Sequence, residues 1–295
     1  MKTDRIKIYA LWAVIMLFFS SCVEDVDLEG RVDTTPKMVV NCMISPELDS
    51  VILLLTQTAP IFSKGEIAIL TQALVEISND QQQWHRLNFN SMLQRYVITH
   101  EEFPVEHGKT YYLRASNPGF ENVTASCKVP YYRETPLNYK ILSKKFKEDA
   151  FFSTAYYIYD IGLEWQDYPS EENYYYFLPY EEYEEYGWDN SIYFRSDAYP
   201  TKLLLSDKGK DGQKLSVTIK DMYVSYYDEK QPPLYPLMAV QMDKHLFMYE
   251  SRQSDSDLDF FNMEPSGIYT NVNNGYGVFG AFTMRKIPEI PFVEK

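Results

Sequence analysis

The amino-acid sequence predicts a mainly β protein, with an N-terminal immunoglobulin-like β-sandwich followed by a second β-rich domain that contains one short helix. Short segments in which apolar and polar residues alternate recur along the chain, and this alternation is the period of a strand with one buried face. Aromatic residues make up 16% of the chain, and Tyr is the commonest of them. Because Tyr favours strands, the composition supports the same fold class.

Seven alternating segments lie in the first half of the chain. They are Met38–Ile44, Val51–Thr56, Ala73–Ser78, Trp84–Asn88, Tyr96–Thr99, Tyr111–Ala115 and Val123–Val129. Seven short strands within about ninety residues are typical of a sandwich, so we expect this domain at residues 37–130. Gly108 followed by Tyr111 resembles the tyrosine corner of immunoglobulin-like sandwiches, in which the phenol oxygen bonds to nearby backbone.

The second half is β-rich but less regular. Pro130 and Pro136 interrupt the alternation and predict a boundary, which assigns residues 131–295 to the second domain. The strands predicted there are Ile158–Trp165, Tyr174–Leu178, Ser191–Arg195, Lys214–Ile219, Met222–Tyr227 and Ile268–Asn271. The apolar positions of Pro236–Ser251 approximate one face of a helix, so this stretch is the predicted helix.

Three closely spaced glycines, Gly275, Gly277 and Gly280, lie at the start of a predicted apolar strand, Val278 to Met284. A glycine-rich loop that binds phosphate normally opens a helix. Because the continuation here is strand-like, we interpret the glycines as a turn or a close backbone approach.

The first two dozen residues have the pattern of an export signal with a lipidation site. The pattern consists of Lys2, Arg5 and Lys7, an apolar run from Ile8 to Phe19, and then Ser20, Ser21 and Cys22. A charged start, a short apolar core and small residues before a cleavage point are features of secretory signals, and a bilayer span needs about 20 apolar residues. The Ser-Ser-Cys ending resembles the lipobox of bacterial lipoproteins. We therefore expect a signal peptide at 1–21 and a palmitate-type lipid on Cys22; an ordinary secretory signal and an uncleaved anchor are the alternatives.

An acidic tether is expected at residues 22–36, because this stretch is unpatterned and rich in carboxylates. The whole chain has a formal charge of −14. Removal of residues 1–21 takes away three basic residues and one acidic residue, which gives −14 − 3 + 1 = −16. This charge argues against nucleic acid as a partner, since phosphate binding needs clustered Lys and Arg. Cationic and neutral ligands stay open.

Two cysteines follow the lipidation site, Cys42 and Cys127, and both occupy apolar positions of alternating segments. Both thiols are therefore expected to face a core. They are a candidate disulfide, which would stabilise the fold by about 2–4 kcal/mol; two separate buried thiols are the alternative, because the sequence does not give the Cα separation that pairing needs.

No motif predicts an enzyme, a cofactor or a metal site. The residues at His100–His107 lack the helical spacing of zinc proteases. Asp255, Asp257 and Asp259 alternate like the start of a calcium loop, but Phe260 stands where the turn glycine belongs. The sequence also lacks the Gly-x-Ser-x-Gly elbow of α/β-hydrolases.

The segment Tyr156–Phe194 is the part of the sequence that most favours a binding role, because it combines many aromatic rings and carboxylates with no Lys or Arg. Rings and carboxylates suit a cationic peptide, an amine, a sugar or a metal complex. The candidate ligand-binding residues are Tyr174, Tyr176, Tyr180, Tyr183, Tyr186, Trp188, Glu181 and Glu184. The alternative is that alternate tyrosines pack inward while the glutamates line a solvated loop.

Several sequence segments resemble those of a known family. They are Glu264-Pro265 with Ile268–Val272 and Gly275–Ala281, Leu163–Asp167 with Asn173–Tyr175, the opening Met38–Val40, and Gly108–Tyr111. The chain resembles a lipoprotein family of the Bacteroidota known as domain of unknown function four-two-four-nine. The resemblance implies an outer-membrane lipoprotein, often encoded beside TonB-dependent transporters, with no established ligand. The family often has Gly where this chain has Cys42, so the resemblance implies no disulfide.

The expected function is therefore that of an outer-membrane lipoprotein with a non-catalytic binding or accessory role beside a TonB-dependent nutrient transporter. Glu24 and Asp25 behind Cys22 resemble the acidic signal that sends such lipoproteins to the cell surface. A structural or adhesive envelope protein, which binds other surfaces through the Tyr-rich acidic segment, is the alternative. A hydrolase would need converging carboxylates about 5–9 Å apart.

Overall fold

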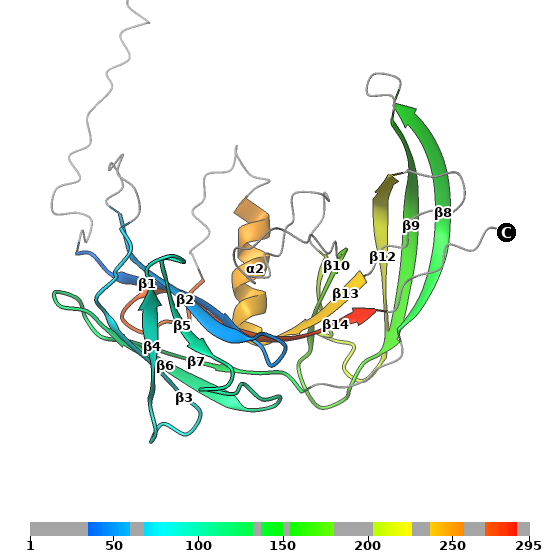
Figure 1. Ribbon diagram of the computed structural model, residues 1–295. Coiled ribbons are helices and arrows are strands. Elements are labelled where there is room, and N and C mark those ends of the chain that lie inside the picture. The colour runs from blue at the N-terminus through cyan, green and yellow to red at the C-terminus, as the bar shows by residue number, and fades with distance from the viewer. Residues whose placement is uncertain are drawn as a thin grey trace, which may run out of the picture. The chain divides into compact units, whose positions relative to one another are not determined.

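The computed structural model describes residues 35–59, 68–131, 137–149, 154–179, 203–225, 237–256 and 269–287. Pro36–Lys295 forms one compact unit, and the predicted domain boundary at 130 lies inside it. The described part is mainly β with one helix, which confirms the predicted fold class (Figure 1).

The strands of the first half are β1 (Met38–Ile44), β2 (Ser50–Gln57), β3 (Leu74–Ser78), β4 (His85–Asn90), β5 (Arg95–Thr99), β6 (Thr110–Ser116) and β7 (Val123–Lys128). Each of the seven predicted strands is present, with bounds that differ by two residues at most. Burial alternates along β1, β6 and β7 as the sequence pattern predicted. Two layers, β1, β2 and β5 on one side and β3, β6 and β7 on the other, share one apolar core (Figure 1). The immunoglobulin-like assignment stays a prediction.

The tyrosine corner has the geometry that the sequence predicted. The backbone N–H of Glu106 donates to the Tyr111 hydroxyl oxygen at 2.6 Å, and the hydroxyl donates to the carbonyl oxygen of Pro104 at 3.3 Å. The ring itself is fully buried. The hydroxyl thus fixes the loop before β6 to the core while satisfying its own bonding capacity.

The second half contains β8 (Asn138–Asp149), β9 (Thr154–Gln166), β10 (Tyr174–Pro179), β11 (Leu203–Ser206), β12 (Lys214–Ser225), β13 (Leu237–Met242), helix α2 (Lys244–Ser256) and β14 (Tyr276–Ile287). Strands β8, β9 and β12 form a three-stranded sheet, and the others join the first half in one eleven-stranded sheet of order β11-β10-β13-β14-β1-β2-β5-β4-β3-β6-β7. The link is β14, which pairs parallel to β1 and antiparallel to β13.

Two glycines within β14 allow this link, as the close-approach interpretation expected. Gly277 has a φ of +97°, and a Cβ there would overlap the carbonyl oxygen of Val40 on β1. A Cβ on Gly280 would lie 2.8 Å from the Cβ of Leu246 on α2. Gly277 therefore lets two backbones meet in parallel register, and Gly280 lets the helix lie against the strand.

The sheet segment formed by β10, β13 and β14 is covered on both faces. On one face Tyr174, Tyr176 and Val240 pack against Leu246 of α2. On the other face, Phe177 packs against a core that includes Trp165 of β9. Strands that are buried on both sides lose the simple alternation of apolar and polar residues, which explains why the second half reads less regularly.

The predicted helix at Pro236–Ser251 is wrong in its first half. Leu237–Met242 is strand β13, which pairs with β10 on one side and β14 on the other. The helix starts only at Lys244 and extends to Ser256. Met238, Val240 and Met242 fit either period over so short a stretch, and the two neighbouring strands decide between them.

The predicted strand at Ile268–Asn271 is also wrong in its described part, because Tyr269–Asn271 forms no strand. The side chain of Asn271 makes the hydrogen bonds to β14 that a neighbouring strand would otherwise make. The N–H of Phe279 donates to its Oδ1 at 3.0 Å, and its Nδ2 donates to the Phe279 carbonyl oxygen at 2.7 Å. The two predicted strands at Lys214–Ile219 and Met222–Tyr227 are, as far as Ser225, one strand, β12, with a register shift between Ile219 and Met222. Residues 226 and 227 lie outside the described residues. Ser191–Arg195 lies outside the described residues.

Cys42 and Cys127 lie in the same core, as predicted. Both are buried and free, so the structure shows two separate thiols and not the candidate disulfide. Burial raises the pKa of both thiols, which makes the reactive thiolate scarce.

Candidate functional site

Strand β10 contains the first two of the predicted ligand-binding residues, Tyr174 and Tyr176. Its side chains point alternately to the two faces of the sheet. Tyr174 and Tyr176 point into the core beside α2 and are 8% and 4% exposed. For these two residues the structure has the inward packing that was the alternative interpretation. The other predicted residues, Tyr180, Tyr183, Tyr186, Trp188, Glu181 and Glu184, lie outside the described residues.

The ring of Tyr174 is buried, and its hydroxyl group forms a hydrogen bond. Its ring packs against the ring of Phe247 of α2, with 4.6 Å between the centroids and a tilt of 32° between the planes. Its hydroxyl donates to Glu172 Oε2 at 2.7 Å, and the same oxygen accepts from Lys244 Nζ at 3.2 Å. These two donors lower the pKa of Glu172, and burial followed by the bond to Glu172 raises the pKa of Tyr174. The three side chains form a linked polar group at the start of β10.

A cavity of about 640 Å³ lies beside this group. Its lining comes from the end of β7, the residues before β10 and the junction of β13 with α2, and it includes Lys128, Tyr131, Glu172, Tyr174, Lys244 and His245. The volume lies within the range of about 300–1,000 Å³ that is usual for small-molecule sites. Because the wall carries ammonium, carboxylate and phenol groups, the cavity suits a polar ligand.

Asp243 caps the N-terminus of α2 at the wall of this cavity. Its Oδ1 accepts from the N–H of Leu246 at 2.8 Å, the usual geometry of an N-cap. Its Oδ2 is buried and has no hydrogen-bond partner in the described part of the chain. Burial raises the pKa of Asp243 to about 7, although nearby backbone N–H groups oppose the rise. The cap therefore changes charge near neutral pH.

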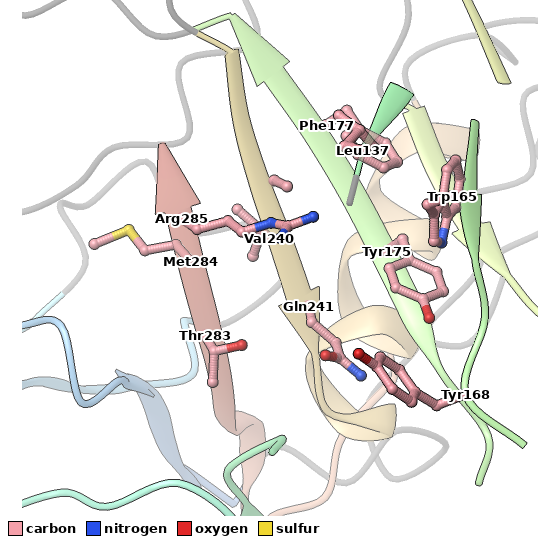
Figure 2. A pocket seen from close by; sticks show the side chains of 11 residues that line it. Leu137, Trp165, Tyr168, Tyr175, Phe177, Val240, Gln241, Thr283, Met284 and Arg285 are labelled. Atoms are coloured by element: carbon pink, nitrogen blue, oxygen red, sulfur yellow. The ribbon is translucent and has the colours of Figure 1, made fainter. Parts of the chain in front are cut away.

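On the opposite face of β10 lies a smaller cavity of about 40 Å³, between the two sheets. Aromatic side chains form one wall, with Trp165 at 5.0 Å from Phe177 and 5.2 Å from Tyr175 between ring centroids. Gln241 and Arg285 from β13 and β14 supply polar groups (Figure 2). Sequence reasoning missed this site, because its lining residues are brought together only by the pairing of β10, β13 and β14.

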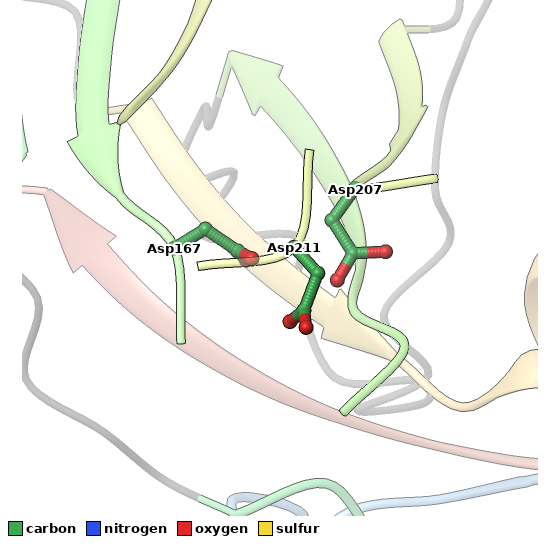
Figure 3. Close-up of side chains that lie close together, drawn as sticks. All are labelled: Asp167, Asp207 and Asp211. Carbon is green, nitrogen blue, oxygen red and sulfur yellow. The ribbon is translucent and has the colours of Figure 1, made fainter. Parts of the chain in front are cut away.

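A cluster of three carboxylates lies just beyond Tyr175. The oxygens of Asp167, Asp207 and Asp211 lie within 4.8 Å of one another, and Figure 3 shows the carboxyl groups converging. Asp167 and Asp207 are buried. Burial, with the charges of Asp167 and Asp211, raises the pKa of Asp207. The Asp207–Gly212 turn, with its spaced Asp and Gly residues, is the sequence signal that marks this loop.

Each carboxylate of the cluster already accepts hydrogen bonds from the chain. Tyr175 Oη donates to Asp167 at 2.5 Å, the N–H of Asn173 donates to Asp207 at 3.0 Å, and the N–H of Ser170 donates to Asp211 at 2.9 Å. Carboxylate oxygens are the ligands that Ca²⁺ prefers. These hydrogen bonds, however, already join the loop before β10 to the loop before β12. A structural role in linking the two loops therefore explains the cluster without a bound metal ion.

The predicted lipidation site, Cys22, lies outside the described residues, as do the signal peptide and most of the tether. Among the helices that the structure describes, none is long and apolar enough to cross a membrane. The lipid anchor therefore stays a prediction from the sequence.

Two comparisons bear on the identity of the chain. A family model described as Domain of unknown function (DUF4249) matches residues 23–287, which is most of the chain and nearly all of its described part. A search of curated proteins finds no match.

Proposed function

The chain belongs to the DUF4249 family, and from this premise we propose that it is an outer-membrane lipoprotein that acts by binding, without catalysis, beside a TonB-dependent nutrient transporter. In this proposal the first twenty-one residues are removed, Cys22 carries the lipid, and the acidic stretch before Pro36 spaces the folded unit from the membrane.

The observation that carries the proposal is the order of residues at the N-terminus. Basic residues, a short apolar run and Ser-Ser-Cys follow one another before Cys22, the order of a lipoprotein signal. The family match begins at residue 23, directly after this cysteine. The compact unit begins at Pro36, which leaves a carboxylate-rich stretch between the two. Glu24 and Asp25 support a position on the cell surface.

The geometry supports binding as the activity. The larger cavity beside β10 has the volume of a small-molecule site and a polar wall with both signs of charge. The smaller cavity on the opposite face joins aromatic rings to a guanidinium group. Both lie on the rigid sheet and not on loops alone, which suits recognition.

The decisive experiment measures the lipid on Cys22. The full chain is expressed in a bacterial host, labelled with palmitate and examined by intact mass. We expect the mature chain to begin at Cys22 with fatty acid attached, and the variant Cys22→Ser to lose the label. Cys127→Ala keeps Cys22 and serves as the matched control, since Cys127 is buried in the core. A bare Cys22, or retention of residues 1–21, would contradict the proposal.

The transporter partner needs a separate test. A tagged chain is isolated from membranes with mild detergent and the associated proteins are identified, while uptake of individual nutrients is compared with and without the gene. A co-purified transporter together with a nutrient-specific growth defect supports the proposal. A loss of attachment with normal uptake would favour the structural or adhesive alternative instead.

A further inference from the structure

The smaller cavity is built on a regular grid of side chains. In the register of β10, β13 and β14, Tyr175 lies opposite Gln241, which lies opposite Thr283. The next row in the same direction of the sheet face is Phe177, Ala239 and Arg285. Because residues two apart on a strand share a face, these six side chains point to the same side, toward Trp165.

Ala239, at the centre of the second row, leaves room for the cavity because its side chain is only a methyl group. Its methyl group is flanked by the Phe177 ring and the Arg285 side chain, and the cavity of about 40 Å³ includes all three in its lining. A water molecule needs about 10–15 Å³ measured in this way. The cavity therefore has room for a group of three or four heavy atoms, the size of a carboxylate with its adjoining carbon.

Arg285 supplies an unused positive charge to this space. Figure 2 shows its side chain extending from β14 across β13, whereas the neighbouring Met284 points the other way. The residue is half-buried, and no residue that the structure describes forms a hydrogen bond or an ion pair with its guanidinium. Arg114, by contrast, pairs with Glu76 at 2.7 Å. A half-buried charge without a partner costs free energy. An anion that enters the cavity would therefore gain a strong, bidentate hydrogen-bonded contact with the guanidinium.

The wall opposite Arg285 is apolar. Trp165 and Phe177 face the cavity with their rings, and Leu137 lies beside them in the same core. Among the described residues, the lining contains no carboxylate. An anion alone would leave these rings unused, whereas a short hydrocarbon tail would bury against them.

We propose that this cavity binds a small organic acid, with its carboxylate on the guanidinium of Arg285 and the adjoining carbon against Trp165 and Phe177. The proposal deepens the binding role proposed above, on which it rests. It names a substrate class for the site, a short monocarboxylic acid of the size of acetate.

Several carboxylates near the cavity oppose an anion. Those of Asp167, Asp207 and Asp211 lie beyond Tyr175, whose hydroxyl donates to Asp167, and Glu47 accepts from the N–H of Met284, next to Arg285 in sequence, at 3.4 Å. Their field weakens the binding of any anion, so the preference for a carboxylate over a neutral group depends on Arg285. This dependence makes a single substitution decisive.

The test compares acetate with its neutral isostere acetamide by isothermal titration on the purified full chain. Wild type is expected to bind the acid at least about tenfold more tightly than the amide, because a charge-assisted bidentate contact is lost in the amide. Arg285→Gln is expected to remove this preference. Arg95→Gln removes the same charge from a half-buried position on β5 and is expected to leave it unchanged.

Two further measurements keep the test sharp. Ala239→Leu fills the cavity without touching the charge, and it is expected to abolish acetate binding. The indole N–H signal of Trp165 is expected to shift with acetate in wild type and not in Ala239→Leu, which places the ligand. Arg285→Lys retains the charge without the planar fork and is expected to bind with intermediate affinity.

Equal binding of acid and amide by wild type, the absence of acetate binding, or an unchanged preference in Arg285→Gln would each overturn the proposal. Failure here is distinguishable from failure of the proposed function. A chain that carries lipid on Cys22 and does not bind acetate would disprove only this site, and a chain that binds acetate without lipid would disprove only the anchor.

Discussion

The core between β1 and β7 and the two cores beside β10 differ in how their polar groups are satisfied. In the first, Tyr96 accepts from the N–H of Ala73 and donates to the carbonyl of Leu70, and Tyr111 is bonded at both ends as well. Beside β10, one oxygen of Asp243 is buried and Arg285 lies at a cavity wall, both without a partner among the residues that the structure describes. Satisfied polar groups favour stability, whereas unsatisfied ones beside cavities favour a ligand. The comparison thus supports the proposal that the second region, and not the first, binds a ligand.

The largest effect is expected where the two regions join, at Gly277. A methyl group there would overlap the Val40 carbonyl oxygen, and the φ of +97° is unfavourable for any side chain. Gly277→Ala is expected to lower the free energy of unfolding by about 3 kcal/mol or more. Gly119→Ala is the matched control, because Gly119 has a φ of +86° with no neighbouring atom within 4 Å; it should cost only about 1 kcal/mol.

Chemical denaturation of both variants measures these losses. Equal losses in the two variants would contradict the close approach of β14 to β1. A single transition in Gly277→Ala means that the regions unfold together, and two transitions mean that each keeps its own stability, which tests the predicted boundary at residue 130.

A smaller effect with opposite signs is expected at two aspartates, one in each region. Burial raises the pKa of Asp243 to about 7, so its contribution to stability is complete below about pH 4 and is lost as the pH rises toward 7. Asp243→Asn retains a capping oxygen and removes this loss. The variant is expected to match wild type near pH 4 and to exceed it above pH 7 by at most about 4 kcal/mol, since one pKa unit is worth about 1.4 kcal/mol.

Asp80 in the first region is the control for sign. Backbone N–H groups of Gln83 and Gln82 lower its pKa, so its contribution is present above about pH 4 and is lost as the pH falls. Asp80→Asn is therefore expected to reduce stability at neutral pH and to match wild type in acid. Denaturation curves between pH 2 and pH 8 compare the two, and parallel pH profiles for Asp243→Asn and wild type would contradict the raised pKa.

The smallest effect is expected at the tyrosine corner. Tyr111→Phe keeps the buried ring and removes the hydroxyl, which leaves the N–H of Glu106 without its acceptor. The expected loss is about 1–2 kcal/mol. Tyr112→Phe, next in sequence but on the other face of β6, should change stability by less than about 0.5 kcal/mol. Thermal unfolding measures both, and an equal shift in the two variants would show that the corner contributes nothing specific.

The sequence predicted the first region well because its strands have one buried face each. Alternation placed all seven strands within two residues and placed Cys42 and Cys127 in a core. It failed at β13, where apolar residues at 238, 240 and 242 fit a strand and a helix equally, and it missed β8 and β11. The sequence also named Tyr174 and Tyr176 as candidate ligand contacts, and it does not show that α2 covers that face of β10; of the two, Tyr174 lines the larger cavity.

The sequence by itself determined the mainly β class, the strands of the first half, the tyrosine corner and the export pattern ending at Cys22, because each depends on neighbours within a few residues. Only the tertiary structure decided that β14 pairs with β1, that β13 is a strand, and that Ala239, Phe177 and Arg285 share a cavity. Those outcomes depend on pairing between segments that lie far apart along the chain, and local periodicity carries no information about which strands become neighbours.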